Sequence, residues 1–197
     1  MLKIGVLALQ GAVSEHIKQI ESAGQAAVAV KKASELSSID ALIIPGGEST
    51  AIKKLIDYYE FKAPIQQFSA EKKPIFGTCA GLVLLANELA DGSEAHLRLM
   101  DISVKRNAFG RQKDSFETML QVKGFTDNVP AVFIRAPIIT EVTEHVEVLA
   151  TYDNQIVAAK QDHLLVTSFH PELTEDNRWM KLFIEMVKQA HQKATIH

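Results

Sequence analysis

The chain has 197 residues, 47 % hydrophobic and 23 % charged, with a formal net charge of −3. This length fits one domain, residues 1–197, that buries roughly 70 % of its unfolded surface. The charge gives no basic stripe for nucleic acid, and the longest apolar run, from about Cys79 to Ala86, is far too short to span a bilayer. The single cysteine excludes an internal disulfide and suits a reducing compartment, so we expect a cytoplasmic protein that binds neither nucleic acid nor membrane.

The first half of the chain alternates short β-rich segments with segments of helical character. The predicted elements are strand Lys3–Leu9, helix Ser14–Ala23, strands Ala26–Val30 and Ala41–Ile44, helices from about Thr50 to Tyr59 and near Pro64–Ala70, strand Lys73–Gly77 and helix Leu82–Leu89. This alternation is typical of a parallel sheet with helices on both faces.

The second half is dominated by strands. They are predicted at Ile102–Arg106, Thr118–Val122, Ala131–Arg135, Val146–Tyr152, Ile156–Lys160 and Leu164–Phe169, before one amphipathic helix at about Glu175–Gln192. Tight turns at 153–154 and 161–162 indicate a local antiparallel meander. We therefore predict a three-layer α/β fold, in which helices flank a mostly parallel central sheet that antiparallel strands extend in the second half. Ligands of such sheets bind beyond the carboxyl ends of the strands, where the turns after several strands can gather on one rim.

Cys79 is the only cysteine and sits in Gly77-Thr78-Cys79-Ala80-Gly81. A predicted strand precedes it and a predicted helix follows it, which is the elbow on which G-x-S-x-G hydrolases carry their nucleophile. The glycines let the chain turn sharply and leave the side chain projecting above the sheet. A helix N-terminus directed at the sulfur favours the thiolate. A lone cysteine is usually a small buried hydrophobic residue, so a catalytic role for Cys79 requires a matching base elsewhere in the chain.

The matching base lies in Ser168-Phe169-His170-Pro171-Glu172, where the last predicted strand ends. Residues i and i+2 of an extended chain face the same way, so His170 and Glu172 can lie side by side. Pro171 between them stiffens the pair. The imidazole can take a thiol proton with one nitrogen and donate its other N–H to the carboxylate. An arbitrary His-x-Glu is more often structural, but together with the cysteine elbow it favours a Cys-His-Glu triad.

A glycine pair supplies candidate hydrogen-bond donors for an oxyanion. Gly46 and Gly47 follow a buried strand and precede a helix, and adjacent glycines allow bare N–H groups to point at an oxygen. The Ala80 N–H, directly after the nucleophile, is the natural second donor. Pro-Gly-Gly alone is often only a turn. Glu48 can either complement the dipole of the following helix or bind an ammonium group.

The sequence contains no familiar cofactor motif, neither G-x-G-x-x-G, nor a Walker lysine motif, nor H-E-x-x-H. Its histidines show no metal-ligand spacing beside another cysteine. We therefore expect no cofactor and no metal. His16, His96, His145 and His163 are interpreted as surface or hydrogen-bonded histidines and not as catalytic ones.

The combination of a Gly-x-Cys-x-Gly elbow and a late His-x-Glu resembles the class I (triad) glutamine amidotransferases, whose fold is flavodoxin-like. Within them the chain is most similar to the glutaminase subunits of pyridoxal 5′-phosphate synthase, over essentially its full length. The segments that carry this resemblance are Gly5–Gly11, Pro45–Thr50, Phe76–Leu82, Arg106–Gln112, Phe133–Pro137 and Ser168–Leu173.

The resemblance implies that L-glutamine is hydrolysed to L-glutamate and ammonia. Cys79 would form a γ-glutamyl thioester, His170 would move the proton and Glu172 would orient His170. The implied glutamine contacts are Gly46, Gly47, Glu48, Arg106, Ile134 and Arg135, and the implied oxyanion donors are Gly47 and Ala80. The ammonia would pass to a synthase subunit, which builds pyridoxal phosphate from pentose and triose phosphates, within a large hetero-oligomer.

Three alternatives remain open at this point. The ammonia could serve another biosynthesis, such as that of imidazole glycerol phosphate, although the Gly-Gly-Glu-Ser-Thr segment argues against this. The chain could be a stand-alone thiol hydrolase that needs no partner. It could also be a regulatory binding module, against which the presence of Cys79, His170 and Glu172 argues.

Overall fold

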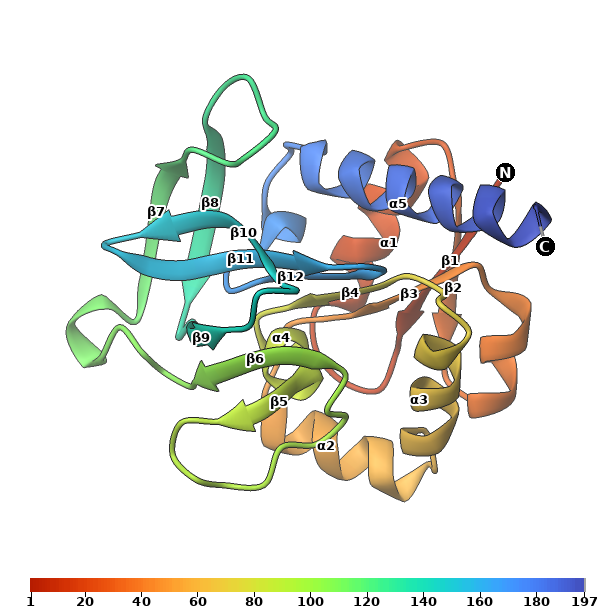
Figure 1. The fold of residues 1–197 in the computed structure, drawn as a ribbon, viewed down its shortest axis with the longest axis horizontal. Helices are drawn as coiled ribbons and strands as arrows, with labels where there is room; N and C mark the ends of the chain where they lie inside the picture. Colours follow the sequence, from red (N-terminus) through yellow and green to blue (C-terminus); the bar gives the residue numbers. More distant parts are fainter. Residues whose placement is uncertain (197) are drawn as a thin grey trace.

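The computed structural model describes residues 1–196, Gln112 by its backbone alone. Within them, a ten-stranded mixed sheet lies between two layers of helices (Figure 1). The strand order is β2-β1-β3-β4-β12-β11-β9-β6-β5, with β10 paired to β11 beside this path. Strands β7 and β8 form a separate two-stranded sheet.

The N-terminal half forms the parallel part of the large sheet. Its elements are β1 (Lys3–Leu7), α1 (Val13–Ser22), β2 (Ala26–Val30), β3 (Ala41–Ile44), α2 (Ser49–Tyr58), α3 (Lys62–Ala70), β4 (Ile75–Thr78) and α4 (Ala80–Leu85). Strand β1 pairs in parallel with β2 and β3, and β4 pairs in parallel with β3 and β12. The predicted parallel sheet with helices on both faces is confirmed.

The C-terminal half adds the antiparallel part. Its elements are β5 (Ala86–Leu89), β6 (Met100–Lys105), β7 (Ser115–Leu120), β8 (Val129–Ile134), β9 (Ile138–Val142), β10 (Glu147–Tyr152), β11 (Gln155–Gln161), β12 (Leu164–Thr167) and α5 (Arg178–Thr195). Strands β10, β11 and β12 form the predicted meander. The other predicted strands of this half do not join the meander, because β7 and β8 form their own sheet. Strand β9, which the sequence analysis did not predict, links β11 to β6.

The helix after Cys79 is shorter than predicted. We expected Leu82–Leu89 to be helical, but the helix ends at Leu85 and residues 86–89 form β5. Ala86 adopts an extended ψ of 144°, and β5 pairs in parallel with β6. The N–H groups of Leu97 and Leu99 bond to the carbonyls of Leu84 and Leu85 at the end of α4. Pairing with the sheet therefore overrides the helical propensity of this segment.

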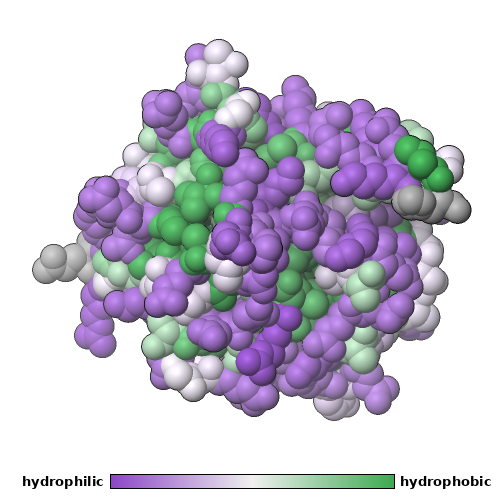
Figure 2. Space-filling view, viewed as in Figure 1, coloured by the Kyte–Doolittle hydropathy of each residue, from purple (hydrophilic) through white to green (hydrophobic). Residues whose placement is uncertain are grey.

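The parallel strands are buried on both faces, and neighbouring residues contribute to opposite sides. Ile44 packs with residues of α2, α3 and α4, whereas Ile43 packs with residues of α1 and α5. Figure 1 shows α1 and α5 above the sheet and α2 and α3 below it. The face seen in Figure 2 is mostly hydrophilic, with hydrophobic residues gathered over the strands in its left half.

The turns after β1, β3, β4 and β12 meet at one rim, as the predicted topology requires. The Ala12 N–H bonds to the Gly46 carbonyl at 3.1 Å, which joins the turns after β1 and β3. The Cys79 N–H bonds to the Thr167 carbonyl at 2.8 Å, which joins the ends of β4 and β12. The candidate residues therefore come together because their strands end side by side.

Candidate active site

Cys79 occupies a strained elbow between β4 and α4. Its φ of 51° and ψ of −102° are unfavourable for a residue with a side chain, and such strain concentrates at functional sites. The flanking glycines are needed for close packing. A Cβ on Gly77 would lie 2.6 Å from the Gly81 carbonyl carbon, and one on Gly81 would lie 2.2 Å from the Ile44 oxygen. The cysteine itself therefore takes the positive φ, and the glycines let the elbow lie against β3.

Gly46 borders both Cys79 and His170. A Cβ built on Gly46 would stand 2.3 Å from His170 Cε1 and 3.4 Å from Cys79 Cβ. Cys79 and His170, 91 positions apart in the chain, therefore both border this glycine. Only a residue without a side chain leaves room for both groups.

His170 and Glu172 form a buried pair. His170 Nδ1 lies 2.5 Å from Glu172 Oε1, and the two residues are 7 % and 5 % exposed. The contact is made by a single turn of 3-10 helix at Pro171–Leu173, not by the extended strand expected from sequence, since β12 ends at Thr167. The His170 N–H also bonds to the Val132 carbonyl at 2.8 Å, which fixes the turn against β8.

The pair is electrostatically coupled. Burial alone would lower the pKa of His170, but its interactions with Cys79 and Glu172 outweigh burial and raise that pKa to about 10. Burial likewise works to raise the pKa of Glu172, and the hydrogen bond with His170 holds it below its usual value. The imidazole is therefore protonated and the carboxylate ionised near neutral pH.

The thiol lies close enough to the imidazole to raise the pKa of His170, and it also makes a backbone contact. Cys79 Sγ makes a weak hydrogen bond to the Ile134 carbonyl at 3.9 Å. Catalytic hydrogen bonds are often loose in a protein without substrate. A thiol, a protonated histidine and a carboxylate at one rim can carry out nucleophilic acyl transfer.

Known proteins are similar to this chain over most or all of its length. Residues 6–189 match the model of the SNO glutamine amidotransferase family. The chain belongs to this family. It is 55 % identical to the pyridoxal 5′-phosphate synthase subunit PdxT of Geobacillus thermodenitrificans, covering 99 % of this chain and 100 % of that protein. It is 54 % identical to the PdxT of Bacillus cereus strain B4264, covering both chains completely.

Solved structures agree with the fold of this amidotransferase. A crystal structure of a glutamine amidotransferase superposes with a TM-score of 0.89 at 42 % identity, over 94 % of this chain and 98 % of the other. A glutamine amidotransferase from Thermotoga maritima superposes with a TM-score of 0.61 at 14 % identity, over 100 % and 86 %, which shows a shared fold alone. The prediction of a class I amidotransferase fold is confirmed.

The glycine pair and Glu48 of the amidotransferase sit at the N-terminus of α2. The Glu48 carboxylate caps this helix by accepting hydrogen bonds from the N–H groups of Thr50 and Ala51, and these bonds, chiefly that from Thr50, lower the pKa of Glu48. A Cβ on Gly47 would lie 2.3 Å from Gln10 Oε1, which accepts the Glu48 N–H at 3.1 Å. Glu48 therefore occupies the helix-terminus position that is one of the two roles expected from the sequence.

The two predicted arginines lie away from the triad contacts. Arg106 Nη2 lies 2.6 Å from Asp91 Oδ2 in the loop after β5. Hydrogen bonds from Ser93 and Arg106 hold the pKa of Asp91 far below its usual range. Arg135 has a positive φ of 44° and donates its N–H to the Asp114 carbonyl, directly after Ile134, the partner of the thiol.

The structure places one further histidine beside the candidate site. His16 on α1 is 0 % exposed and approaches Glu172, although it was interpreted as a surface or hydrogen-bonded residue. The signal that could have found it is the helical spacing of His16 and Ile20, the buried residues of α1, which places His16 on the side that faces the sheet.

Two further searches of residues 1–196 gave no candidates. No helix in this range combines the length and apolar character that crossing a bilayer requires. No group of three or more His, Cys, Asp or Glu side chains in this range is placed to hold a metal ion.

Proposed function

We propose that this amidotransferase hydrolyses L-glutamine to L-glutamate and ammonia through Cys79, His170 and Glu172, and supplies the ammonia to a subunit that makes pyridoxal 5′-phosphate. The observation that carries the proposal is the strained Cys79 elbow beside the buried His170–Glu172 pair. The relatives named as pyridoxal 5′-phosphate synthase subunits support the destination of the ammonia, because they match over the full length.

The chemistry proceeds in two acyl transfers. The Cys79 thiolate attacks the side-chain amide carbon of glutamine. His170 returns a proton to the nitrogen as the C–N bond breaks, which releases ammonia and leaves a γ-glutamyl thioester. Water, deprotonated by His170, then attacks the thioester carbon and releases glutamate, which regenerates the Cys79 thiolate and leaves the proton from water on His170. Glu172 keeps His170 oriented and stabilises its positive charge in both steps.

Negative charge on the carbonyl oxygen needs donors at the rim. Ala80 is the first residue of α4, so its N–H has no partner within the helix. The Gly46 carbonyl accepts a hydrogen bond from the Ala12 N–H and therefore points toward Ala12. In a trans peptide the carbonyl and the following N–H point in opposite directions, so the Gly47 N–H points away from Ala12. We assign the binding of the oxyanion to the N–H groups of Gly47 and Ala80. Each such donor contributes about 3–4 kcal/mol of transition-state stabilisation.

The amino-acid end of glutamine carries one charge of each sign. An arginine can bind its α-carboxylate in a bidentate manner and a carboxylate can accept from its ammonium group. We assign these contacts to Arg106, Arg135 and Glu48, with Gly46, Gly47 and Ile134 lining the site. Arg106 has to exchange Asp91 for the substrate, which is feasible because both side chains are about half exposed and such exposed pairs contribute little.

We further assign a hetero-oligomer with the synthase subunit as the working form, in the cytoplasm, where the one free thiol stays reduced. The thiol makes a weak hydrogen bond to the Ile134 carbonyl, and the glycine pair that supplies an oxyanion donor can change its backbone state. Docking of the partner is therefore expected to complete the site.

The test measures ammonia release from L-glutamine by the purified chain, alone and with the pyridoxal 5′-phosphate synthase subunit. Addition of the subunit should raise the rate by about a hundredfold, the effect of aligning one oxyanion donor. The Cys79→Ala variant should release no ammonia under either condition. A chain that runs at full rate alone, or that ignores the synthase subunit, would indicate a stand-alone hydrolase or another partner.

A further inference from the structure

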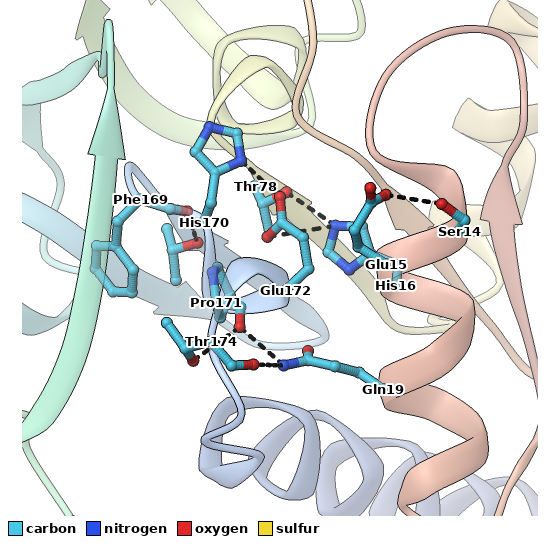
Figure 3. A network of polar contacts seen from close by, with 11 residues as sticks. Ser14, Glu15, His16, Gln19, Thr78, Phe169, His170, Pro171, Glu172 and Thr174 are labelled. Carbon is cyan, nitrogen blue, oxygen red and sulfur yellow. Dashed lines mark hydrogen bonds and ion pairs between the residues drawn. The ribbon is translucent and has the colours of Figure 1, made fainter. Parts of the chain in front are cut away.

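Two buried polar atoms near the triad have no hydrogen-bond partner among the described residues, His16 Nδ1 and Glu172 Oε2. They belong to neighbouring side chains. His16 Nε2 lies 3.7 Å from Glu172 Oε2 and 3.3 Å from Thr78 Oγ1, so Glu172 stands between two histidines (Figure 3). Glu172 gives Oε1 to His170, and its second oxygen faces His16. The triad as proposed above makes no use of His16.

The surroundings decide where the proton of the His16 ring sits. Burial lowers the pKa of His16 in spite of the negative charge of Glu172, and the nearby His170 lowers it further, so the ring is neutral. A neutral imidazole has one N–H. If the proton were on Nδ1, that N–H would be a buried donor without an acceptor. The lone pair on Nε2 would then face the negatively charged carboxylate of Glu172, which is unfavourable. The proton therefore belongs on Nε2, directed at Thr78 and Glu172.

Helix α1 also holds the backbone of the turn that carries Glu172. Gln19 lies three residues after His16, on the same face of the helix. Its Nε2 donates to the Pro171 carbonyl at 2.8 Å and to the Thr174 carbonyl at 3.1 Å (Figure 3). One helix face thus meets both the main chain and the carboxylate of this turn, which places His16 where it can control the orientation of Glu172.

We propose that His16 is a positioning residue of the triad, whose Nε2–H attracts Glu172 Oε2 across 3.7 Å so that Oε1 stays on His170 Nδ1. A neutral donor orients the carboxylate without cancelling the charge that stabilises His170. The charged groups around the His16 ring are Glu172 and His170 from the facing turn and Glu15 on its own helix. This inference rests on the proposed function, because it assigns His16 a part in the same triad.

The test compares His16→Gln with His16→Met. These side chains have nearly the same length and volume, but glutamine carries an amide donor near the position of Nε2 and methionine carries none. His16→Met should lower kcat for glutamine about tenfold or more, the scale on which loss of an outer hydrogen-bond partner acts in other sites, with KM nearly unchanged. His16→Gln should keep most of kcat. Both are measured with the synthase subunit present.

A second readout needs no turnover. The proton in the short hydrogen bond between His170 and Glu172 should give a far-downfield NMR resonance, assigned by its loss in His170→Asn. It should persist in His16→Gln and be lost or shifted upfield in His16→Met. The control is His163→Met, because His163 is a partly buried histidine that bonds Ser69 and forms no hydrogen bond with Cys79, His170 or Glu172 in the part of the chain that the structure describes. This variant should change neither readout.

The outcomes separate the two proposals. A wild-type chain that fails to hydrolyse glutamine even with the synthase subunit defeats the proposed function, while the downfield resonance still tests the role of His16. Equal losses of kcat in both His16 variants, or a downfield proton that His16→Met leaves unchanged, would overturn the positioning role.

Discussion

At the scale of single residues, the triad combines a strained thiol with a coupled acid–base pair. The sequence predicted the pairing of His170 with Glu172 and the elbow at Cys79, because both are local patterns. It could not predict that the pair would form through a 3-10 turn, nor that His16 would approach Glu172. Contacts between side chains 156 positions apart depend on how helices pack on the sheet, which no local pattern encodes.

Glu172→Gln should lower the pKa of His170 from about 10, because burial then acts without the opposing carboxylate. An NMR titration of the His170 ring from pH 5 to 11 measures this. The raised pKa also stabilises the fold. This contribution is fully present below about pH 6.5, the unperturbed histidine pKa, and is lost as pH rises through about 10. The pH dependence of unfolding by urea should therefore weaken in Glu172→Gln. A His170 that titrates as in wild type would mean that Glu172 does not control it.

At the scale of elements, periodicity and turn residues predicted most of the parallel half, since buried strands and amphipathic helices have strong local signals. The errors lie where the antiparallel strands pair. Residues 86–89 were predicted as helix and form β5, and β9 (residues 138–142) was not predicted at all. Both segments are strands because they pair with distant strands, β5 with β6 and β9 with β6 and β11. Such pairing outweighs the local propensity of the sequence.

Gly81→Ala should destabilise the elbow, because its Cβ would lie 2.2 Å from the Ile44 backbone oxygen, which cannot move aside cheaply. Overpacking of this kind costs about 1–3 kcal/mol of the unfolding free energy, measured by urea denaturation. Gly124→Ala is the matched control. Gly124 has a φ of +88° but open space around it, so only backbone strain of about 1 kcal/mol applies. If the Gly81 variant is no less stable than the control, the close packing of α4 on β3 is not required.

At the scale of the whole molecule, one rim collects the ends of strands from both halves of the chain. The order β1-β3-β4-β12 brings Gly46, Cys79 and His170 together, although β12 lies far along the sequence. The α/β pattern predicted that the turns after the early strands would share a rim. That β12 would pair beside β4 follows from the fold as a whole, and this pairing brings the proposed base close to the proposed nucleophile.

The central claim is that Cys79 releases the nitrogen that enters pyridoxal 5′-phosphate. In the most direct measurement, this chain is combined with the synthase subunit, and the complex is supplied with glutamine that carries ¹⁵N in its side-chain amide. Mass spectrometry then follows the label into pyridoxal phosphate. The wild-type complex should incorporate the label. The Cys79→Ala complex should incorporate none from glutamine and should still form the product from ammonium salt. Label from glutamine appearing equally with Cys79→Ala, or never appearing with the wild-type complex, would contradict the claim.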